Sequence, residues 1–366
     1  MTKIERIKQM LEERVLLFSD LHIGNKMNSS AFHKTALGYV EWLKQTANDN
    51  HINTLIFLGD FFHYREELNL TAVYTANKFL ETLKDFQIII LVGNHDCYYK
   101  DNARIHSTQI FEKWDNIVVV DETTSFEYMD KTIAFLPWGF DYSEIPSKVD
   151  YAFGHLEIET FRVNKVKICE KNHHSINSAS LLKKIDKVIT GHFHVRSEKK
   201  YKSGIIKYIG NTYEQNWSDY QEEKGVEILN FSTGEMEFIK NDVSPKHIKV
   251  SLSKILAKDE DEIAILKNDF KGNITKLIVD EEVDIEKVYA ISDRLSKLKP
   301  LDFNAEIITS SSNKTADDFE SVEIDMDLLL TEYVEKLEIE DNKDKILSET
   351  LSLYEEALLE VNTNDE

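Results

Sequence analysis

The sequence is poor in the residues that mark secreted and membrane proteins. Only two of its 366 residues are cysteine and four are proline, and no apolar run approaches the roughly 20 residues of a membrane-spanning helix. Cys97 and Cys169 stand in unrelated contexts, which argues against a disulfide framework or a thiolate metal site. Residues 1–14 are charged and amphipathic, without the apolar core of a signal peptide. We therefore expect a cytoplasmic protein with no membrane association.

Basic residues are also scarce, and the formal net charge is −22. Spread evenly, this charge would repel a polyanion such as DNA. Residues 309–366, however, contain 18 acidic residues against four lysines, so most of the acidity belongs to a tail. Residues 165–171 and 195–202 are locally basic. They are compatible with a phosphate backbone, although a solvated surface is the simpler explanation.

Short apolar runs rich in β-branched residues recur in the first two thirds of the chain. They predict strands at residues 15–20, 54–60, 88–94, 117–121, 133–138, 151–155, 187–192, 206–211 and 225–231. Helix-like segments at residues 30–48 and 70–86 separate the first three, which indicates βαβ units and an α/β fold. The later strands follow one another with little helix between them. Part of the sheet is therefore antiparallel or forms a second packed sheet.

The character of the chain changes after residue 240. We predict a small βαβαβ domain at residues 241–308, with a polar linker at residues 309–322. Residues 323–366 form an acidic tail with two amphipathic helices. The apolar stripes of these helices cover either the chain's own small domain or a partner, and the linker before them favours a partner.

Several predicted strands end on side chains that are poorly suited to a core. These are Asp20, His22, Asp60, Asn94, His155, His192 and His194. Because the carboxyl ends of strands in an open α/β sheet converge on one crevice, we expect these side chains to meet. Carboxylates, a carboxamide and imidazoles without cysteine suit hard and borderline divalent cations. Seven ligands are more than one such ion needs, whereas two ions about 3.5–4 Å apart would use all seven.

The motifs DLH, GD, GNHD, GH and GHFH, in this order, resemble the signature of the calcineurin-like metallophosphoesterases. Within that superfamily GDFFHYREE resembles the nuclease branch, which has a His three residues after the shared Asp, here His63 after Asp60. Protein phosphatases have Asp-Arg-Gly there. The chain is similar to the nuclease subunits of the SbcCD and meiotic-recombination-eleven family, and most of all to the phage recombination endonuclease subunit.

The resemblance implies an architecture. Residues 1–240 would form the nuclease domain, a four-layer metallophosphoesterase β-sandwich flanked by helices. The small α/β domain at residues 241–308, for capping or DNA binding, and the C-terminal helical tail would follow. The motifs themselves cover about residues 14–211, and beyond them the likeness is architectural.

The resemblance also implies a role for each motif residue. Asp20, His22 and His194 would bind one metal, Asn94, His155 and His192 a second, and Asp60 both. His95 would act as acid or transition-state stabiliser, and His63 would orient the phosphodiester. Asp96 would support the loop or the His95 imidazole from behind. The family often has Gly-Ser where this chain has Gly210 and Asn211, which affects the substrate-side contacts.

Four further residues fit no motif role. Cys97 has no activating base nearby in the sequence, and we expect a buried small side chain. His106, His173 and His174 are expected at the surface.

The implied function is that of a two-metal-dependent DNA nuclease, acting as exonuclease and endonuclease in DNA end processing, recombination and repair. Manganese is the implied activator, and magnesium is also compatible. The implied partners are DNA, an SbcC-type SMC-like coiled-coil ATPase that receives the C-terminal helices, and a second nuclease subunit. If phage-encoded, the protein would work in the host cytoplasm. One alternative is a phosphatase or phosphodiesterase acting on a phosphoprotein or small nucleotide. Another is a non-catalytic subunit that binds a partner.

Overall fold

The structure, a computed structural model, describes residues 1–256, 261–280, 285–307 and Lys345. The chain divides into two compact units, and the first contains Met1–Ile248 with the short segments Asp269–Ile274 and Lys299–Asp302. Apart from Lys345, the predicted linker and helical tail at residues 309–366 lie outside the described residues. The predicted boundary between residues 240 and 241 stays a prediction.

The first unit contains two six-stranded sheets, and the first of them carries the parallel strands expected near the N-terminus. Its order is β12-β11-β1-β2-β3-β4. The strands are β1 (Arg14–Phe18), β2 (Thr54–Phe57), β3 (Gln87–Leu91), β4 (Ile117–Val120), β11 (Gly225–Asn230) and β12 (Met236–Lys240). Strands β1 to β4 are parallel, while β11 is antiparallel to β1 and β12 to β11.

The second sheet has the order β5-β6-β7-β8-β10-β9. Its strands are β5 (Thr124–Tyr128), β6 (Lys131–Leu136), β7 (Val149–His155), β8 (Ile185–Gly191), β9 (Ser197–Tyr201) and β10 (Gly204–Tyr208). The four inner strands are parallel, and the edge strands β5 and β9 are antiparallel to their neighbours. The expectation that later strands include antiparallel pairs and form a second sheet is confirmed in both respects.

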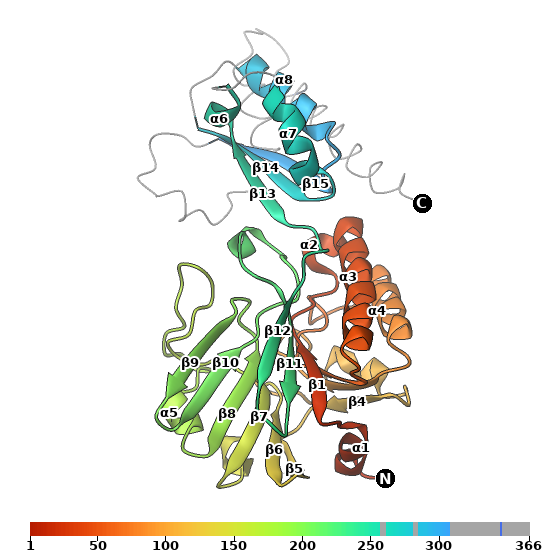
Figure 1. Ribbon diagram of the computed structural model, residues 1–366, viewed down its shortest axis with the longest axis vertical. Helices are drawn as coiled ribbons and strands as arrows, with labels where there is room; N and C mark the ends of the chain where they lie inside the picture. Colours follow the sequence, from red (N-terminus) through yellow and green to blue (C-terminus); the bar gives the residue numbers. More distant parts are fainter. Residues whose placement is uncertain (257–260, 281–284, 308–344, 346–366) are drawn as a thin grey trace. The chain divides into compact units, whose positions relative to one another are not determined.

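Two helices lie side by side over the outer face of the first sheet, α3 (Ser30–Asp49) and α4 (Leu70–Thr82) (Figure 1). The N-terminal helix α1 (Lys3–Met10) begins with a capping box, in which the Thr2 and Glu5 side chains bind each other's main-chain N–H. The remaining helical segments of this unit are short. They are α2 (Asn25–Asn28), α5 (Ser178–Leu181), η1 (Ser107–Phe111), η2 (Tyr142–Glu144) and η3 (Trp217–Asp219).

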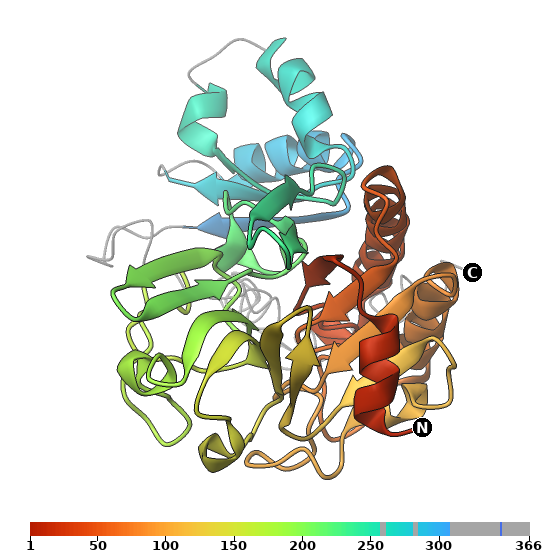
Figure 2. The same cartoon turned by 60° about the horizontal axis from the view of Figure 1, so that its bottom comes forward.

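Alternating side chains of the first sheet pack into two different hydrophobic cores. In β1, Leu16 and Phe18 pack toward α3 and α4, whereas Val15 and Leu17 pack against the second sheet. Figure 2 shows the two sheets facing each other. Each fully buried side chain of this size contributes about 1.5–3 kcal/mol. A one-residue slip would exchange the two sets, so the register and the strand ends are firmly fixed.

The outer face of the second sheet is covered differently. Its core includes Phe161 and Leu181, from the segment between β7 and β8, packed with Val188 and Tyr208 of the sheet. The only helix of that segment is the short α5. The fourth layer of the sandwich is therefore mainly irregular chain rather than long helices.

The second unit is built on a three-stranded sheet of order β13-β14-β15. In chain order its elements are β13 (His247–Ser251), α6 (Leu252–Leu256), α7 (Asp261–Phe270), β14 (Ile274–Val279), α8 (Ile285–Ser296) and β15 (Asp302–Ile307). All five elements predicted for this region are present, with the short α6 in addition. In the part of the chain that the structure describes, no helix is both long enough and apolar enough to cross a bilayer.

Candidate metal centre

The loops that follow β1 and β2 are hydrogen-bonded to each other. The main-chain N–H of Asp20 donates to the Gly59 carbonyl at 3.0 Å, and that of His22 donates to the Asp60 carbonyl at 3.1 Å. This pairing continues the parallel register of the two strands past their ends. It places three predicted ligands from two strands side by side.

Four of the predicted ligands have left-handed backbone conformations. Their φ angles are 55° at Asp20, 48° at His22, 62° at Asp60 and 89° at His192. Such conformations cost about 1–3 kcal/mol each for residues other than glycine and persist only where the surrounding structure imposes them. The strand ends are thus shaped to turn these side chains toward one another at some cost in stability.

Asp20, His22 and His194 form one group that could hold a metal ion. The Nε2 atoms of His22 and His194 lie 3.1 Å apart, and His22 Nε2 lies 3.9 Å from Asp20 Oδ1. Asp20 is fully buried, and its Oδ1 has no hydrogen-bond partner. A buried carboxylate oxygen that faces two imidazole nitrogens without a donor is costly in itself, and a divalent cation would satisfy it.

Asp60, His155 and His192 form a second such group. Asn94 completes it, because its Oδ1 lies 2.9 Å from His155 Nε2 and 2.8 Å from His192 Nδ1. Side chains at the ends of β2, β3, β7 and β8 thus come together in this group. All seven residues predicted as ligands meet in these two groups.

The carboxylate of Asp60 lies between the two groups. Its Oδ2 is 3.5 Å from His22 Nε2 of the first group and 3.3 Å from His155 Nε2 of the second. Its Oδ1 accepts the main-chain N–H of His95 at 2.8 Å. The side chain is therefore held by one oxygen and presents the other to both groups.

Burial and neighbouring charges shift the pKa values of the histidines in the centre in different directions. Burial lowers the pKa of His22 well below its usual value and lowers the pKa of His192 to about 3. Burial opposes protonation of His155 as well, but the Asp60 carboxylate outweighs it and raises the pKa of His155 to about 9. His155 Nδ1 donates to the Leu58 carbonyl at 2.6 Å, so Nε2 faces Asp60. A position that attracts a proton this strongly also suits a metal cation.

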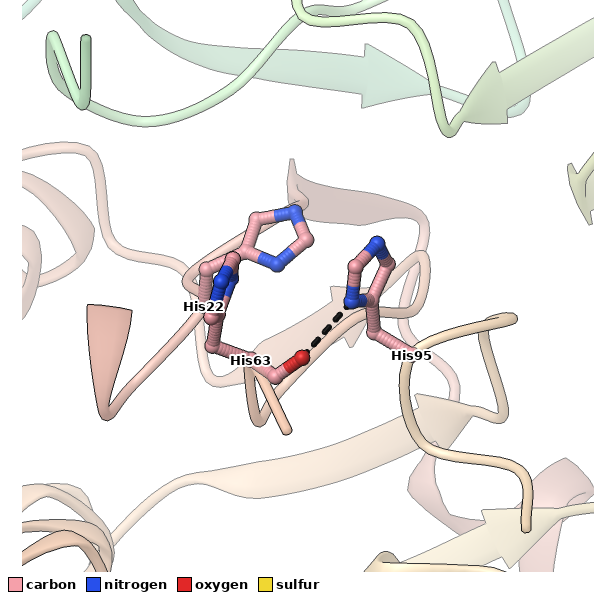
Figure 3. A group of neighbouring side chains, drawn as sticks. All are labelled: His22, His63 and His95. Carbon is pink, nitrogen blue, oxygen red and sulfur yellow. Dashed lines mark hydrogen bonds between the residues drawn. The ribbon is translucent and has the colours of Figure 1, made fainter. Parts of the chain in front are cut away.

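His63 and His95 lie beside the first group, and their rings stack with centroids 5.4 Å apart. His95 Nδ1 donates to the main-chain carbonyl of His63 at 2.7 Å (Figure 3). Both residues line a cavity of about 270 Å³ together with His22 and His194. With Nδ1 engaged, Nε2 is the ring atom of His95 that is left for a ligand in this cavity. Burial and the neighbouring His95 lower the pKa of His63 to about 4.

Asp96 supports the centre from behind, as the sequence predicts. Its carboxylate is buried and accepts the main-chain N–H groups of four residues at 2.9–3.1 Å. These are Asp60, Phe61, Phe62 and Gly93. Asp96 thus fixes the turns after β2 and β3, whereas the His95 imidazole is held by His63 instead.

Two glycines next to the ligands are required by close approach. A Cβ on Gly59 would lie 2.4 Å from His155 Nδ1, and its φ of +99° is unfavourable for other residues. A Cβ on Gly93 would lie 2.3 Å from the Asp60 main-chain nitrogen. Any larger residue at either position would displace a ligand.

The cavity also contains residues that sequence reasoning missed. Lys26 lines it, as do Asn25, Gln215 and Asn216. Lys26 begins a run of three non-glycine residues with left-handed φ, of 52°, 54° and 61°. No motif or periodicity marks these positions in a single sequence. Only the fold shows that the loop after His22 returns to the cavity.

Some expectations outside the ligand set need correction. His106 is buried rather than at the surface, with 4% of its surface exposed. Asn211 is fully buried, and its side chain lies 3.5 Å from Nδ1 of the predicted ligand His194. Cys97 is buried as predicted, and burial raises the pKa of its thiol well above its usual value. His173 is exposed and His174 is partly exposed, which fits a surface location.

The chain is similar to several known proteins. Exonuclease subunit 1 of Enterobacteria phage T4 is 25% identical over 362 residues, which cover 94% of this chain and 99% of the phage protein. Among solved structures, an archaeal phosphodiesterase is 17% identical with a TM-score of 0.35 and covers 62% of this chain and 99% of its own. A dimetal phosphatase from Danio rerio is 12% identical with a TM-score of 0.39 and covers 63% of this chain and 96% of its own. Residues 13–196, half of the chain, match the calcineurin-like phosphoesterase family, and the chain belongs to that family.

Proposed function

We propose that this protein is a two-metal-dependent DNA nuclease that hydrolyses phosphodiester bonds as exonuclease and endonuclease. The observation that carries the proposal is the position of Asp60 Oδ2, 3.5 Å from His22 Nε2 and 3.3 Å from His155 Nε2. A carboxylate between two groups of imidazoles can be shared by a pair of cations. Similarity to a phage exonuclease subunit along 94% of the chain favours DNA as the substrate.

The residues fit two divalent cations. Asp20, His22 and His194 would hold one, Asn94, His155 and His192 the other, and Asp60 both. Oxygen and imidazole ligands without a thiolate suit manganese, and they also accept magnesium. When bound, such ions supply Lewis acidity toward phosphoryl oxygens and activate water at neutral pH.

The protein's own groups position the substrate and move the proton. In its doubly protonated form, with Nδ1–H held by the His63 carbonyl, His95 would donate the Nε2 proton to the leaving oxygen and be left as a neutral imidazole. His63, stacked on His95 in the same cavity, would orient the phosphodiester. The Lys26 ammonium would bind a neighbouring phosphate of the DNA backbone.

Further partners are also part of the proposal. The phage T4 relative is called a subunit of an exonuclease, which supports a complex with an SbcC-type SMC-like ATPase. Residues 323–366 would bind that ATPase through the apolar stripes of two amphipathic helices. Two nuclease subunits would pair within the complex. Its setting would be DNA end processing, recombination and repair in the host cytoplasm.

The activity is tested with the purified full-length chain and a panel of substrates. Linear DNA, closed circular single-stranded DNA, bis-p-nitrophenyl phosphate, p-nitrophenyl phosphate and a 3′,5′-cyclic nucleotide are compared with manganese and with EDTA. We expect cleavage of both DNA forms that EDTA abolishes. Rapid hydrolysis of p-nitrophenyl phosphate or the cyclic nucleotide without DNA cleavage would support the phosphatase or phosphodiesterase alternative and contradict the proposal.

The partner assignment has its own test. Deleting residues 323–366 should abolish co-purification with the candidate ATPase, while the manganese content of the nuclease chain stays the same. If the truncated chain still co-purifies with the ATPase, the tail is not the binding segment.

A further inference from the structure

A second cluster of metal-ligating side chains lies at the end of β4, and none of its members lines the cavity described above. Asp121 follows directly on β4, as Asp20 follows closely on β1 and Asp60 on β2. Facing Asp121 are His106 and Glu112, at the two ends of the short helical segment η1. One ligand atom from each of the three residues lies within 4.8 Å of the other two. The proposed nuclease chemistry uses none of them.

The buried member of this cluster is His106. Its side chain has no exposed surface, and its Nε2 makes no hydrogen bond. The Nε2 atom lies 3.7 Å from Asp121 Oδ2, which is beyond hydrogen-bond distance. Two ligands of one tetrahedral ion, each bonded at about 2.0–2.2 Å, lie roughly 3.3–3.6 Å apart. The spacing therefore suits a shared cation better than a direct hydrogen bond.

The other ring nitrogen of His106 is engaged in the way that metal-binding histidines require. Nδ1 lies 2.8 Å from the Thr108 hydroxyl oxygen, which can accept its proton. With Nδ1 protonated, Nε2 presents a lone pair toward Asp121 and Glu112. A hydrogen bond on the outer nitrogen of this kind sets the tautomer and orientation of a metal-binding imidazole.

The charges of the cluster also leave room for a cation. Asp121 and Glu112 are both carboxylates, and the Lys3 ammonium binds Asp121 only through Oδ1. Asp121 Oδ2 therefore remains directed toward His106. A neutral imidazole, two carboxylates and one ammonium sum to a single negative charge, which a divalent cation would more than neutralise.

We propose that His106, Glu112 and Asp121 form a third cation site, separate from the catalytic pair and specific for a divalent transition metal of the zinc type. One imidazole with two carboxylates is a ligand set that zinc accepts, and zinc binds nitrogen and oxygen ligands more tightly than manganese. Glu112 is exposed, so the ion can enter from solvent.

An ion at this site would stabilise the loop after the catalytic histidine. His106 pairs with Cys97 in an isolated β-bridge, and the Tyr98 N–H donates to the Ile105 carbonyl at 2.9 Å. Ser107 donates its main-chain N–H to the Asp96 carbonyl at 2.8 Å. Residues 97–106 thus form a closed loop whose base is tied to Asp96. Fixing His106 would hold that base.

The test measures zinc binding by the full-length chain. Because the catalytic centre also binds metal, the measurement uses the Asp60→Asn background and repeats it in the wild type. We expect each chain to bind one zinc ion beyond any that the catalytic centre holds. His106→Gln should lose this ion. In Glu112→Gln its affinity should fall by more than about tenfold, since even outer-shell partners of a metal have effects of that size. Glu112 is exposed, so this second variant tests the site without disturbing the core. His173→Gln, at an exposed histidine, is the matched control.

A second readout is independent of activity. Zinc should slow amide hydrogen exchange in residues 97–106 of the Asp60→Asn protein, and Glu112→Gln should remove the effect. Equal zinc content and affinity in the Asp60→Asn parent, Glu112→Gln and His106→Gln would overturn the proposal. Loss of DNA cleavage alone would not bear on it, because the readouts are metal content and exchange.

Discussion

The carboxylate of Asp96 accepts the main-chain N–H of Asp60 at 3.0 Å, across 36 positions of sequence. One buried acidic side chain thereby fixes the turn that carries Asp60, whose carboxylate lies between the two groups of candidate ligands. Asp96 does not line the cavity, yet it fixes the main chain of Asp60, which lies between the two groups.

Replacing Asp96 with Ala should destabilise the protein and reduce cleavage together. Four main-chain N–H groups would lose their acceptor, and each buried unsatisfied group costs about 1–3 kcal/mol. We expect the free energy of unfolding to fall by about 3 kcal/mol or more in denaturant titrations. Asp115→Asn, at an exposed position, is the control. An unchanged free energy of unfolding in Asp96→Ala would contradict this role.

Replacing Asp60 with Asn should remove metal and activity but keep the fold. Asn retains the oxygen that accepts the His95 N–H, and it lacks the charge that Oδ2 presents to both groups. We expect a loss of manganese measured by elemental analysis and a fall in DNA cleavage of at least about 10³-fold. Circular dichroism and the melting temperature check the fold. A variant with full metal content and full activity would exclude Asp60 as the shared ligand.

The His95→Asn variant should still bind metal but cleave more slowly. The size of the fall in rate should depend on the leaving group of the substrate. If His95 protonates the leaving oxygen, DNA cleavage should fall by about 10²–10⁴-fold. Hydrolysis of bis-p-nitrophenyl phosphate, whose leaving group needs little protonation, should fall much less. Equal losses on both substrates would indicate that His95 positions the phosphate instead of donating a proton.

Lys26→Gln should weaken DNA binding more than it slows cleavage of a small phosphodiester. One phosphate contact fewer should reduce the slope of log affinity against log salt concentration by about 1. The matched control is Lys84→Gln, because Lys84 is also exposed to solvent and does not line the cavity. The measurement is DNA affinity across a salt series with the metal-free protein. The same slope in wild type and variant would remove Lys26 from the DNA contacts.

The buried ion pair of Asp219 with Lys224 should make stability depend on pH. Burial alone would raise the pKa of Asp219, but Lys224 at 2.7 Å outweighs it and holds the pKa below its usual value. The stability that the ionised carboxylate contributes is present above the unfolded pKa, about 3.9, and is lost as the pH falls through the lower folded value. The difference in melting temperature between wild type and Asp219→Asn should therefore be largest near pH 7. It should shrink toward zero below about pH 4. A constant difference over this range would contradict the assignment.

The first sheet was predictable because its inner strands are continuous apolar runs that end abruptly in polar residues. The predicted strands beginning at residues 15, 54 and 88 correspond to β1 (Arg14–Phe18), β2 (Thr54–Phe57) and β3 (Gln87–Leu91). A buried strand must be apolar at every position, so the sequence marks both its course and its end. The candidate ligands stand at these ends, and their convergence follows from parallel pairing.

Edge strands were not predictable in the same way. The sequence of β9 (Ser197–Tyr201) is SEKKY, and every residue in it is at least partly exposed, so it has no apolar signal. Strand β5 (Thr124–Tyr128) turns into β6 through Met129 and Asp130, both with positive φ. That turn lacks the Asn-Gly or Asp-Gly sequence by which hairpins are recognised.

The burial of His106 depends on contacts between distant parts of the chain. His106 pairs with Cys97 within the loop between β3 and η1, and it lies opposite Asp121, which follows β4. Neither periodicity nor spacing reports such contacts, so a histidine outside every motif is easily assigned to the surface.

The two oxygens of Asp60 have one further consequence. Because Oδ1 holds the main chain of His95 while Oδ2 faces both groups of candidate ligands, the position of the proposed proton donor would depend on the size of an ion bound there. A cation with longer bonds would shift the carboxylate and, through it, the His95 imidazole that we propose as the acid. Cations can therefore differ in the activity that they support because each one positions the His95 imidazole differently. An ion of the wrong radius that binds tightly would act as an inhibitor.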